Sequence, residues 1–266
     1  MREPPFAEPE ETLGLARAAP EPFAGLSGRG VAIAVIDSGV HPGHGHITAS
    51  QLGPGVMVLS DGAVVEGEGV WLDQLGHGTA VTAAIQEKAP DARCIPVRVF
   101  RDALKTSAAA LIGAIRWSVA LEVDVINLSL GSVNAAHRDA FAAVVDEAAA
   151  AGVVIVAARE ANGAPCYPGS LQDVIGVDVD WDCLRTGYGV RWRGDCAIFQ
   201  ASGYPRPIPG VPPRRNLYGV SFAVAQVSGF ASRACESLAN TGSGGERVRQ
   251  VRDLMCAQLP HRDARP

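Results

Sequence analysis

The 266-residue chain has few aromatic residues (6%), no long hydrophobic run and no concentration of positive charge. No stretch of about eighteen apolar residues occurs, so no helix that would span a membrane is expected. The net charge is −5, and Lys and Arg never occur in long runs, so nothing favours a nucleic-acid-binding protein. Two small basic clusters are expected in solvated loops: Arg191–Arg193 and Arg214–Arg215.

The six cysteines show no Cys-x-x-Cys spacing, and the first ten residues have no apolar stretch of the kind found in secretory signals. Scattered cysteines of this kind are typical of reduced thiols rather than of a zinc site or a disulfide framework. The acidic, proline-rich start and the thiols together predict a cytoplasmic protein.

Apolar runs bounded by turn residues alternate with helical patterns along the chain. The runs are typical of strands buried on both faces of a parallel sheet and cover residues 31–36, 94–100, 123–128, 153–158 and 174–179. The helical patterns cover residues 79–88, 107–121, 137–150, 221–237 and 246–259. This alternation predicts an α/β fold with three layers: a doubly wound, mostly parallel sheet with helices on both faces.

No internal repeat and no long linker divides the chain. We expect an N-terminal extension over residues 1–24, with a short helix at 11–18, and a single domain over residues 25–266. A composition of 47% hydrophobic and 19% charged residues is typical of a globular enzyme.

Three residues far apart in the sequence lie in settings that suit nucleophilic catalysis. Asp37 ends a buried strand, where open α/β sheets place functional groups, and His77 lies between two glycines at the start of a helix. Ser221 begins another helix, whose N–H groups and dipole stabilise an oxyanion. A serine hydroxyl attacks only when a base takes its proton and a carboxylate orients that base. The three residues together therefore indicate a hydrolase.

The chain resembles the subtilisin-like serine peptidases, or subtilases, from about residue 10 to residue 258. The resemblance rests on segments that occur in the family's order: Val35–Gly39, Gly76–Thr79, Asp124–Gly131, Gly152–Ala158, Tyr167–Gly169 and Tyr218–Ala223. It implies that Asp37 is the orienting acid, that His77 is the general base and acid, and that Ser221 is the nucleophile. The implied activity is hydrolysis of a peptide or protein substrate through an acyl-enzyme.

The same resemblance implies two walls of a substrate pocket. One wall is the strand that pairs with extended substrate, formed by Ser129, Leu130 and Gly131. The other wall and the pocket floor are formed by Ala158, Arg159, Glu160 and Cys166. Arg159 and Glu160 replace small residues of the family. Their side chains either narrow the pocket and select a charged or small substrate residue, or they point to solvent.

The oxyanion hole departs from the family pattern. Where the family reads Ala-Ala-Gly-Asn-Glu-Gly, residues 157–163 read Ala-Ala-Arg-Glu-Ala-Asn-Gly. Ungapped alignment puts Ala161 at the side-chain donor and Asn162 one place late, and Val220 replaces a threonine. Either a bulge brings Asn162 into position or the backbone N–H of Ser221 acts alone, and the ungapped flanks favour the second.

Two further departures from the family concern its calcium site and its pro-domain. The helix after His77 runs directly into Lys88–Pro90 without the family's calcium-binding loop, and His41 stands where a carboxylate ligand is expected. We therefore expect no metal and no other cofactor. A sheet that begins at Val31 leaves no room for the family's pro-domain. The remaining histidines are expected on the surface or in loops: His41, His44, His46, His137 and His261.

We expect a serine endopeptidase of restricted specificity, such as one that matures a precursor peptide inside the cell, with that peptide or a partner protein as its binding partner. Two alternatives remain open. A degenerate subtilase would bind a peptide or a partner protein with weak or no catalysis, because both side-chain contributors to the oxyanion hole are replaced. An acyl-transfer enzyme would use the same acyl-enzyme to make a cyclic peptide.

Overall fold

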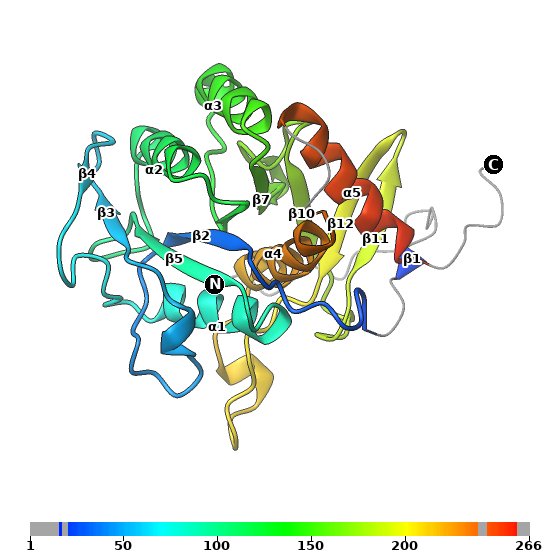
Figure 1. The fold of residues 1–266 in the computed structure, drawn as a ribbon, viewed down its shortest axis with the longest axis horizontal. Helices are drawn as coiled ribbons and strands as arrows, with labels where there is room; N and C mark the ends of the chain where they lie inside the picture. The colour runs from blue at the N-terminus through cyan, green and yellow to red at the C-terminus, as the bar shows by residue number, and fades with distance from the viewer. Residues whose placement is uncertain (1–15, 18–20, 239–243, 260–266) are drawn as a thin grey trace.

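The computed structural model describes residues 16–17, 21–238 and 244–259, and these form one large twisted sheet with helices on both faces (Figure 1). The strands in sheet order are β1 (Ala16–Arg17), β11 (Gly189–Arg193), β12 (Cys196–Ala201), β10 (Ile175–Val179), β7 (Val154–Ala158), β6 (Val125–Leu128), β2 (Ala32–Asp37), β5 (Arg93–Arg98), β3 (Val56–Val58) and β4 (Val64–Val65). Neighbours from β12 to β3 are parallel, and the strands beyond them on both edges are antiparallel.

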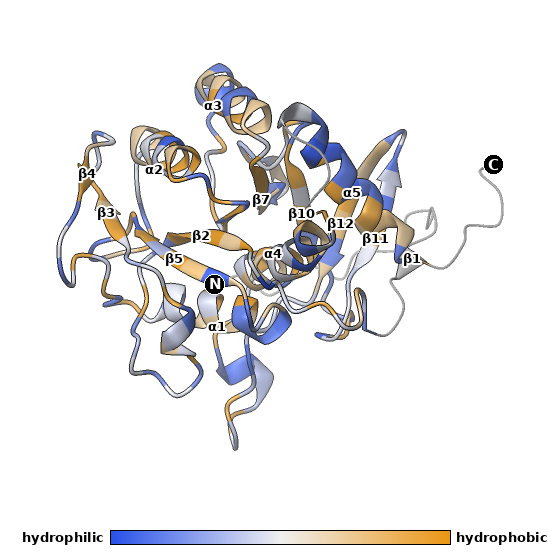
Figure 2. Cartoon of the chain, viewed as in Figure 1, coloured by the Kyte–Doolittle hydropathy of each residue, from blue (hydrophilic) through white to orange (hydrophobic). Residues whose placement is uncertain are grey.

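The central strands are apolar on both faces because each face carries its own core. In β2, Ile33 and Val35 enter one cluster of buried side chains, while Ala34 and Ile36 enter the other. This is the two-residue alternation of a pleated strand. Figure 2 shows β2, β5, β7 and β10 as largely hydrophobic ribbons.

Five helices complete the two outer layers. The bounds are α1 (His77–Lys88), α2 (Ala108–Ala120), α3 (Arg138–Ala150), α4 (Val220–Ser237) and α5 (Arg247–Ala257). Helices α2 and α3 pack on one face of the sheet, and α1, α4 and α5 pack on the other. Helix α4 is apolar around most of its circumference because it is enclosed between the sheet and its neighbours. Within the described ranges, no helix is long and apolar enough to cross a bilayer.

The predicted three-layer fold, five strands and five helices are confirmed, with ends that shift by up to two residues. The short helix predicted at residues 11–18 is wrong where it can be compared: Ala16–Arg17 is strand β1, paired with β11, and residues 11–15 and 18 lie outside the described residues. Arg191–Arg193 was expected in a loop but belongs to β11, where the strand pairs with β12. Arg214–Arg215 lies in an exposed 3₁₀ turn.

The chain topology opens a crevice at the carboxyl ends of β2 and β6. The connection from β2 to β5 includes α1 and crosses one face of the sheet, and the connection from β5 to β6 includes α2 and crosses the other face. Strands β5 and β6 therefore lie on opposite sides of β2. Such a reversal is where open α/β sheets bind ligands. Asp37 is the last residue of β2, and Ser129 follows the end of β6.

Candidate active site

Asp37 and His77 form a buried pair at this crevice. Oδ1 of Asp37 lies 2.7 Å from Nδ1 of His77 and also accepts the N–H of Ser38 at 2.8 Å. The carboxylate is fully buried, and its Oδ2 accepts no hydrogen bond from any described residue. Burial of the imidazole lowers the pKa of His77, but the hydrogen bond and charge of Asp37 and the charge of Asp73 outweigh it, so the net pKa is raised. The pair therefore stabilises an imidazolium.

Two glycines allow the elements that carry this pair to approach closely. Gly39 has φ +98°, and a Cβ there would lie 2.2 Å from the carbonyl oxygen of Trp71. A Cβ on Gly78 would lie 2.2 Å from the carbonyl oxygen of Gly39. The turn after β2 and the first turn of α1 are thus in direct backbone contact, which explains why glycine flanks both chemically active residues.

Asp73 fixes the first turn of α1 through hydrogen bonds. Its Oδ2 accepts the N–H and hydroxyl of Thr79 at 2.9 and 2.6 Å, and its Oδ1 accepts the hydroxyl of Ser38 and two backbone N–H groups. Burial raises the pKa of Asp73, but these hydrogen bonds outweigh it and the net pKa is lowered. Asp73 and Thr79 thus hold the turn, and through it the histidine, in position.

Ser221 lies in the first turn of α4, and no hydrogen bond joins it to His77 among the described residues. Gly219 is the N-cap, Val220 is the first helical residue, and Ser221 is the second. The neighbouring Phe222 contacts His77 with ring centroids 5.6 Å apart. The Ser221 hydroxyl donates to the carbonyl oxygen of Ser129 at 3.4 Å. An N–H in the first turn of a helix has no intrahelical acceptor, so the N–H of Ser221 is oriented for an anion.

A buried polar chain behind Ser221 was not anticipated from the sequence. The side-chain amide of Asn127 donates to Ser129 Oγ at 3.0 Å, and its oxygen accepts the hydroxyl of Ser228 at 3.0 Å. The Ser228 contact joins β6 to α4, and Ser129 Oγ in turn lies 3.5 Å from the carbonyl oxygen of Ser221, so this chain sets the depth of Ser221 relative to the sheet. A lone asparagine inside the apolar run Val125–Leu128 was the signal available in the sequence.

The two predicted walls of the substrate pocket meet where the segment at Gly131 contacts the segment at Cys166. Ser132, which follows Gly131, exchanges two backbone hydrogen bonds of 2.8 Å with Tyr167. A Cβ on Gly131 would lie 2.7 Å from Sγ of Cys166. Cys166 is buried, and burial raises the pKa of its thiol to about 11. The thiol is therefore protonated near neutral pH and serves as packing.

Arg159 and Glu160 do not both project into solvent. The guanidinium of Arg159 is largely buried, pairs with Asp178 on β10 with Nε–Oδ2 at 3.2 Å, and also contacts the carboxylate of Glu160. Arg191 on β11 binds the same aspartate at 2.9 Å. Arg159 is thus anchored to β10, whereas the preceding Ala158 belongs to the core face that carries α4.

Ala161 and Asn162 belong to a small hairpin made of β8 (Glu160–Ala161) and β9 (Ala164–Pro165). Asn162 and Gly163 form its two-residue turn with φ of +53° and +78°, the geometry for which Asn-Gly is preferred. Asn162 is exposed, and although both it and Ser221 are described, no hydrogen bond joins them. The position of the asparagine is therefore explained by the turn.

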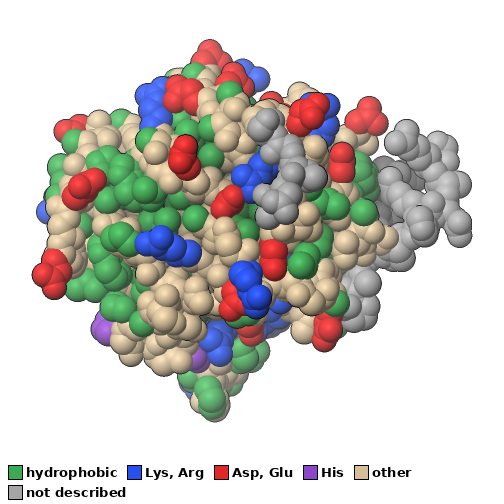
Figure 3. All heavy atoms as spheres, viewed as in Figure 1, with side chains coloured by type: hydrophobic (Ala, Val, Ile, Leu, Met, Phe, Trp, Pro, Cys, Tyr) green, Lys and Arg blue, Asp and Glu red, His purple; other side chains and the backbone are tan. Residues whose placement is uncertain are grey.

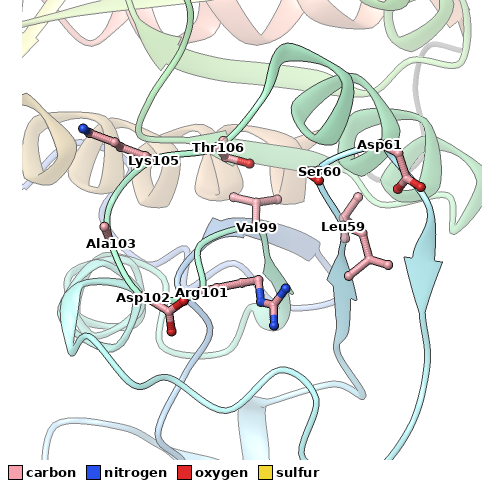
Figure 4. A pocket seen from close by; sticks show the side chains of 10 residues that line it. Leu59, Ser60, Asp61, Val99, Arg101, Asp102, Ala103, Lys105 and Thr106 are labelled. Atoms are coloured by element: carbon pink, nitrogen blue, oxygen red, sulfur yellow. The ribbon is translucent and has the colours of Figure 1, made fainter.

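Two cavities open near the carboxyl ends of the strands. A cavity of about 380 Å³ lies between the β3–β4 turn and the loop after β5, and none of the predicted site residues line it. Figure 4 shows that its wall carries both signs of charge: Asp102 lies beside Arg101, and Lys105 and Asp61 lie at opposite sides of the cavity. A second cavity of about 290 Å³ includes Asp73, Gly76 and Thr79 and so adjoins His77. Among the described residues, no three His, Cys, Asp or Glu side chains gather as a metal site would require.

Comparison with known proteins gives consistent matches. The profile described as the Subtilase family matches residues 28–177, more than half of the chain. That range contains Asp37 and His77 but ends before Ser221. Subtilisin DY of Bacillus licheniformis is 27% identical over 227 residues, which cover 78% of this chain and 77% of the relative. Subtilisin E of Bacillus subtilis (strain 168) is 30% identical over 78% of this chain and 56% of the relative.

Longer relatives match over a smaller part of their length. Subtilisin-like protease SBT6.1 of Arabidopsis thaliana is 26% identical over 89% of this chain but only 22% of the relative. A solved structure described as "Crystal Structure of a Lanthipeptide Protease" has a TM-score of 0.60 at 20% identity, covering 82% of this chain and 77% of that chain. At this identity the structural likeness establishes the fold alone.

Proposed function

We propose that this chain, which belongs to the subtilase family and is a serine protease, cleaves peptide bonds with Asp37, His77 and Ser221 as its catalytic triad. The observation that carries the assignment is the 2.7 Å contact between Asp37 Oδ1 and His77 Nδ1, supported by the contact of His77 with Phe222, the residue that follows Ser221 in the first turn of α4. With Nδ1 held by Asp37, Nε2 of His77 is the ring nitrogen left to take the proton of the nucleophile.

The steps follow from these positions. The Ser221 hydroxyl turns from the Ser129 carbonyl to His77, gives its proton to Nε2, and attacks the substrate carbonyl carbon. The imidazolium is stabilised by Asp37. It then protonates the leaving amine as the C–N bond breaks, which leaves an ester on Ser221. Water, deprotonated by His77, hydrolyses the ester and restores the serine.

The oxyanion of the tetrahedral intermediate is bound by the N–H of Ser221 at the positive end of α4. We assign no side-chain donor to Asn162, because its side chain lies on the exposed turn of the β8–β9 hairpin. In subtilisin, loss of one oxyanion donor lowers kcat about 100- to 1000-fold. A low intrinsic rate is therefore part of the proposal.

We further propose restricted specificity and a role in maturing a precursor peptide within the cell. The support is threefold: the weakened oxyanion site, the anchored Arg159 beside the pocket, and the likeness in fold to a lanthipeptide protease. Cys94, Cys166, Cys196 and Cys235 are thiols, which suits a reducing compartment.

A fluorophosphonate probe tests the proposal, since it reacts only with a serine activated by its base. We expect covalent labelling of Ser221 in the wild-type protein and none in Ser221→Ala. Ser60→Ala is the matched control, because it removes the hydroxyl of an exposed serine on the β3–β4 turn, away from the three residues of the triad. A folded wild-type protein that resists labelling contradicts the proposal and favours a binding protein without catalysis.

A further inference from the structure

The second cavity next to His77 has an unusual distribution of charge. Four segments line it: the loop after β2, the loop before α1 (with Asp73), the first half of α1, and the loop before α4. The first and last of these, residues 40–50 and 203–221, contain no Asp or Glu although the chain as a whole carries a net charge of −5. Figure 3 shows histidine and basic side chains together at the lower margin of the molecule, where Figure 1 shows the loop before α4 projecting.

Arg206 supplies the positive charge of this cavity. One of its guanidinium N–H groups donates to the carbonyl oxygen of His46 at 3.0 Å, which fixes the side chain across the two loops. A guanidinium carries five N–H donors, so others remain for a ligand. Burial and the charge of Arg206 lower the pKa of His46, so that imidazole is neutral near neutral pH.

The neighbouring acids are already compensated. Asp73 lines the cavity, but both of its oxygens accept hydrogen bonds from Ser38, Thr79 and the backbone. Glu87, the other carboxylate that acts on His46, is paired with Arg185 and Lys88. Among the described residues, no carboxylate forms an ion pair with Arg206, so its charge is available to a ligand, although Asp73 also lines the cavity.

The position of the cavity indicates which part of a substrate reaches it. Ser129–Gly131 follow β6, whereas the cavity is lined by the loop after β2, the neighbouring strand, and by α1. The cavity therefore lies on the β2 side of the site and Ser129–Gly131 on its β6 side. The general acid must stand beside the leaving amine. Because Gly76 lines the cavity directly before His77, residues that follow the scissile bond approach it.

We propose that this cavity binds an acidic side chain of the substrate, Asp or Glu, within the first three residues after the scissile bond, with Arg206 as its specificity-determining residue. The volume of about 290 Å³ suits one side chain rather than a larger ligand. The proposal rests on the protease function above and deepens it: the enzyme is restricted to substrates with an acidic residue shortly after the scissile bond.

The test uses the full chain and a proteome-derived peptide library, with cleavage sites read by mass spectrometry. We expect Asp or Glu to be favoured over Asn or Gln at one of these three positions by about tenfold or more, since a hydrogen bond to a charged group contributes about 1.5–3 kcal/mol. Arg206→Gln removes the preference, Arg206→Glu reverses it towards Lys, and Arg206→Lys retains part of it. Arg214→Gln, an exposed arginine of the same loop, keeps it.

Cleavage without an acidic preference, or a preference unchanged in Arg206→Gln, overturns the inference and leaves the protease function standing. Absence of fluorophosphonate labelling overturns both. If Ser221 is labelled but the library is not cut, short alanine peptides with Glu or Gln at the second position are added as competitors of the fluorophosphonate probe. If the Glu peptide slows labelling more than the Gln peptide, and this difference disappears in Arg206→Gln, the inference is supported. If both peptides slow labelling equally, the inference is overturned.

Discussion

His77 and Asp37 are separated by 40 positions in the chain, yet their side chains meet at 2.7 Å, Nδ1 to Oδ1. The aspartate is fully buried, and the histidine is largely so. An imidazole held in this way keeps one tautomer, with Nδ1 protonated and Nε2 available.

Asp37→Asn is expected to lower kcat by about ten-thousand-fold while leaving the fold intact, because the amide reverses the tautomer of His77. The measurement is the rate of peptide cleavage, with circular dichroism to follow the fold. Asp61→Asn changes an exposed carboxylate on the β3–β4 turn and is the control. A cleavage rate in Asp37→Asn within tenfold of wild type contradicts the assigned role.

The pH dependence of labelling is expected to follow the raised pKa of His77. The base acts in its neutral form, so the rate rises with pH through a midpoint above the ordinary value of 6.5. In Asp37→Asn the charge that raises the pKa is gone while burial still lowers it, so the midpoint falls below 6.5. The rate of fluorophosphonate labelling of Ser221 as a function of pH measures the midpoint in both proteins. An unchanged midpoint in Asp37→Asn would contradict the effect of Asp37 on the pKa of His77.

Asp73→Asn is expected to destabilise the protein by about 1–3 kcal/mol at neutral pH, towards the lower value because the carboxylate is only half buried. The pKa of Asp73 is lowered in the fold, so its stabilising contribution is present above the unfolded value of 3.8 and is lost as the pH falls through the folded one. Urea unfolding should therefore show the two proteins converging in acid. Asp139→Asn, at an exposed site, should match wild type throughout.

Asn162→Gly is expected to leave both stability and labelling rate nearly unchanged. The residue has φ +53° in an exposed hairpin turn, a conformation that glycine adopts without strain. Were the amide an oxyanion donor, the rate would fall about 100- to 1000-fold. Labelling kinetics of the variant therefore separate a turn residue from a catalytic donor.

Gly78→Ala is expected to lower the cleavage rate by about 100-fold, because small displacements of catalytic groups have effects of that size. The new Cβ would lie 2.2 Å from the carbonyl oxygen of Gly39 and would move the first turn of α1, which carries His77. Gly45→Ala is the control, since nothing lies within 4 Å of the Cβ at that position. Equal activity in the two variants would show that the close approach is not required.

The central layers of the fold were predictable because strands buried on both faces read as continuous apolar runs. Strands β2, β5, β6, β7 and β10 were predicted on this signal. Strand β11 was missed because one of its faces is exposed and carries Arg191 and Arg193, so its sequence resembles a charged loop. The two-residue strands β1, β4, β8 and β9 are too short to show any period.

The sequence by itself determined the α/β layers, the family and the identity of the three candidate catalytic residues, because these depend on residue type, spacing and chain order. Only the tertiary structure decided what surrounds them. Asn162 turned out to sit in a hairpin turn, Arg159 to be paired with Asp178, and Asn127 to tie β6 to α4. Arg206 and His46 are 160 positions apart and meet only in the fold. Such contacts arise from strand order and helix packing, which no local pattern in the chain encodes.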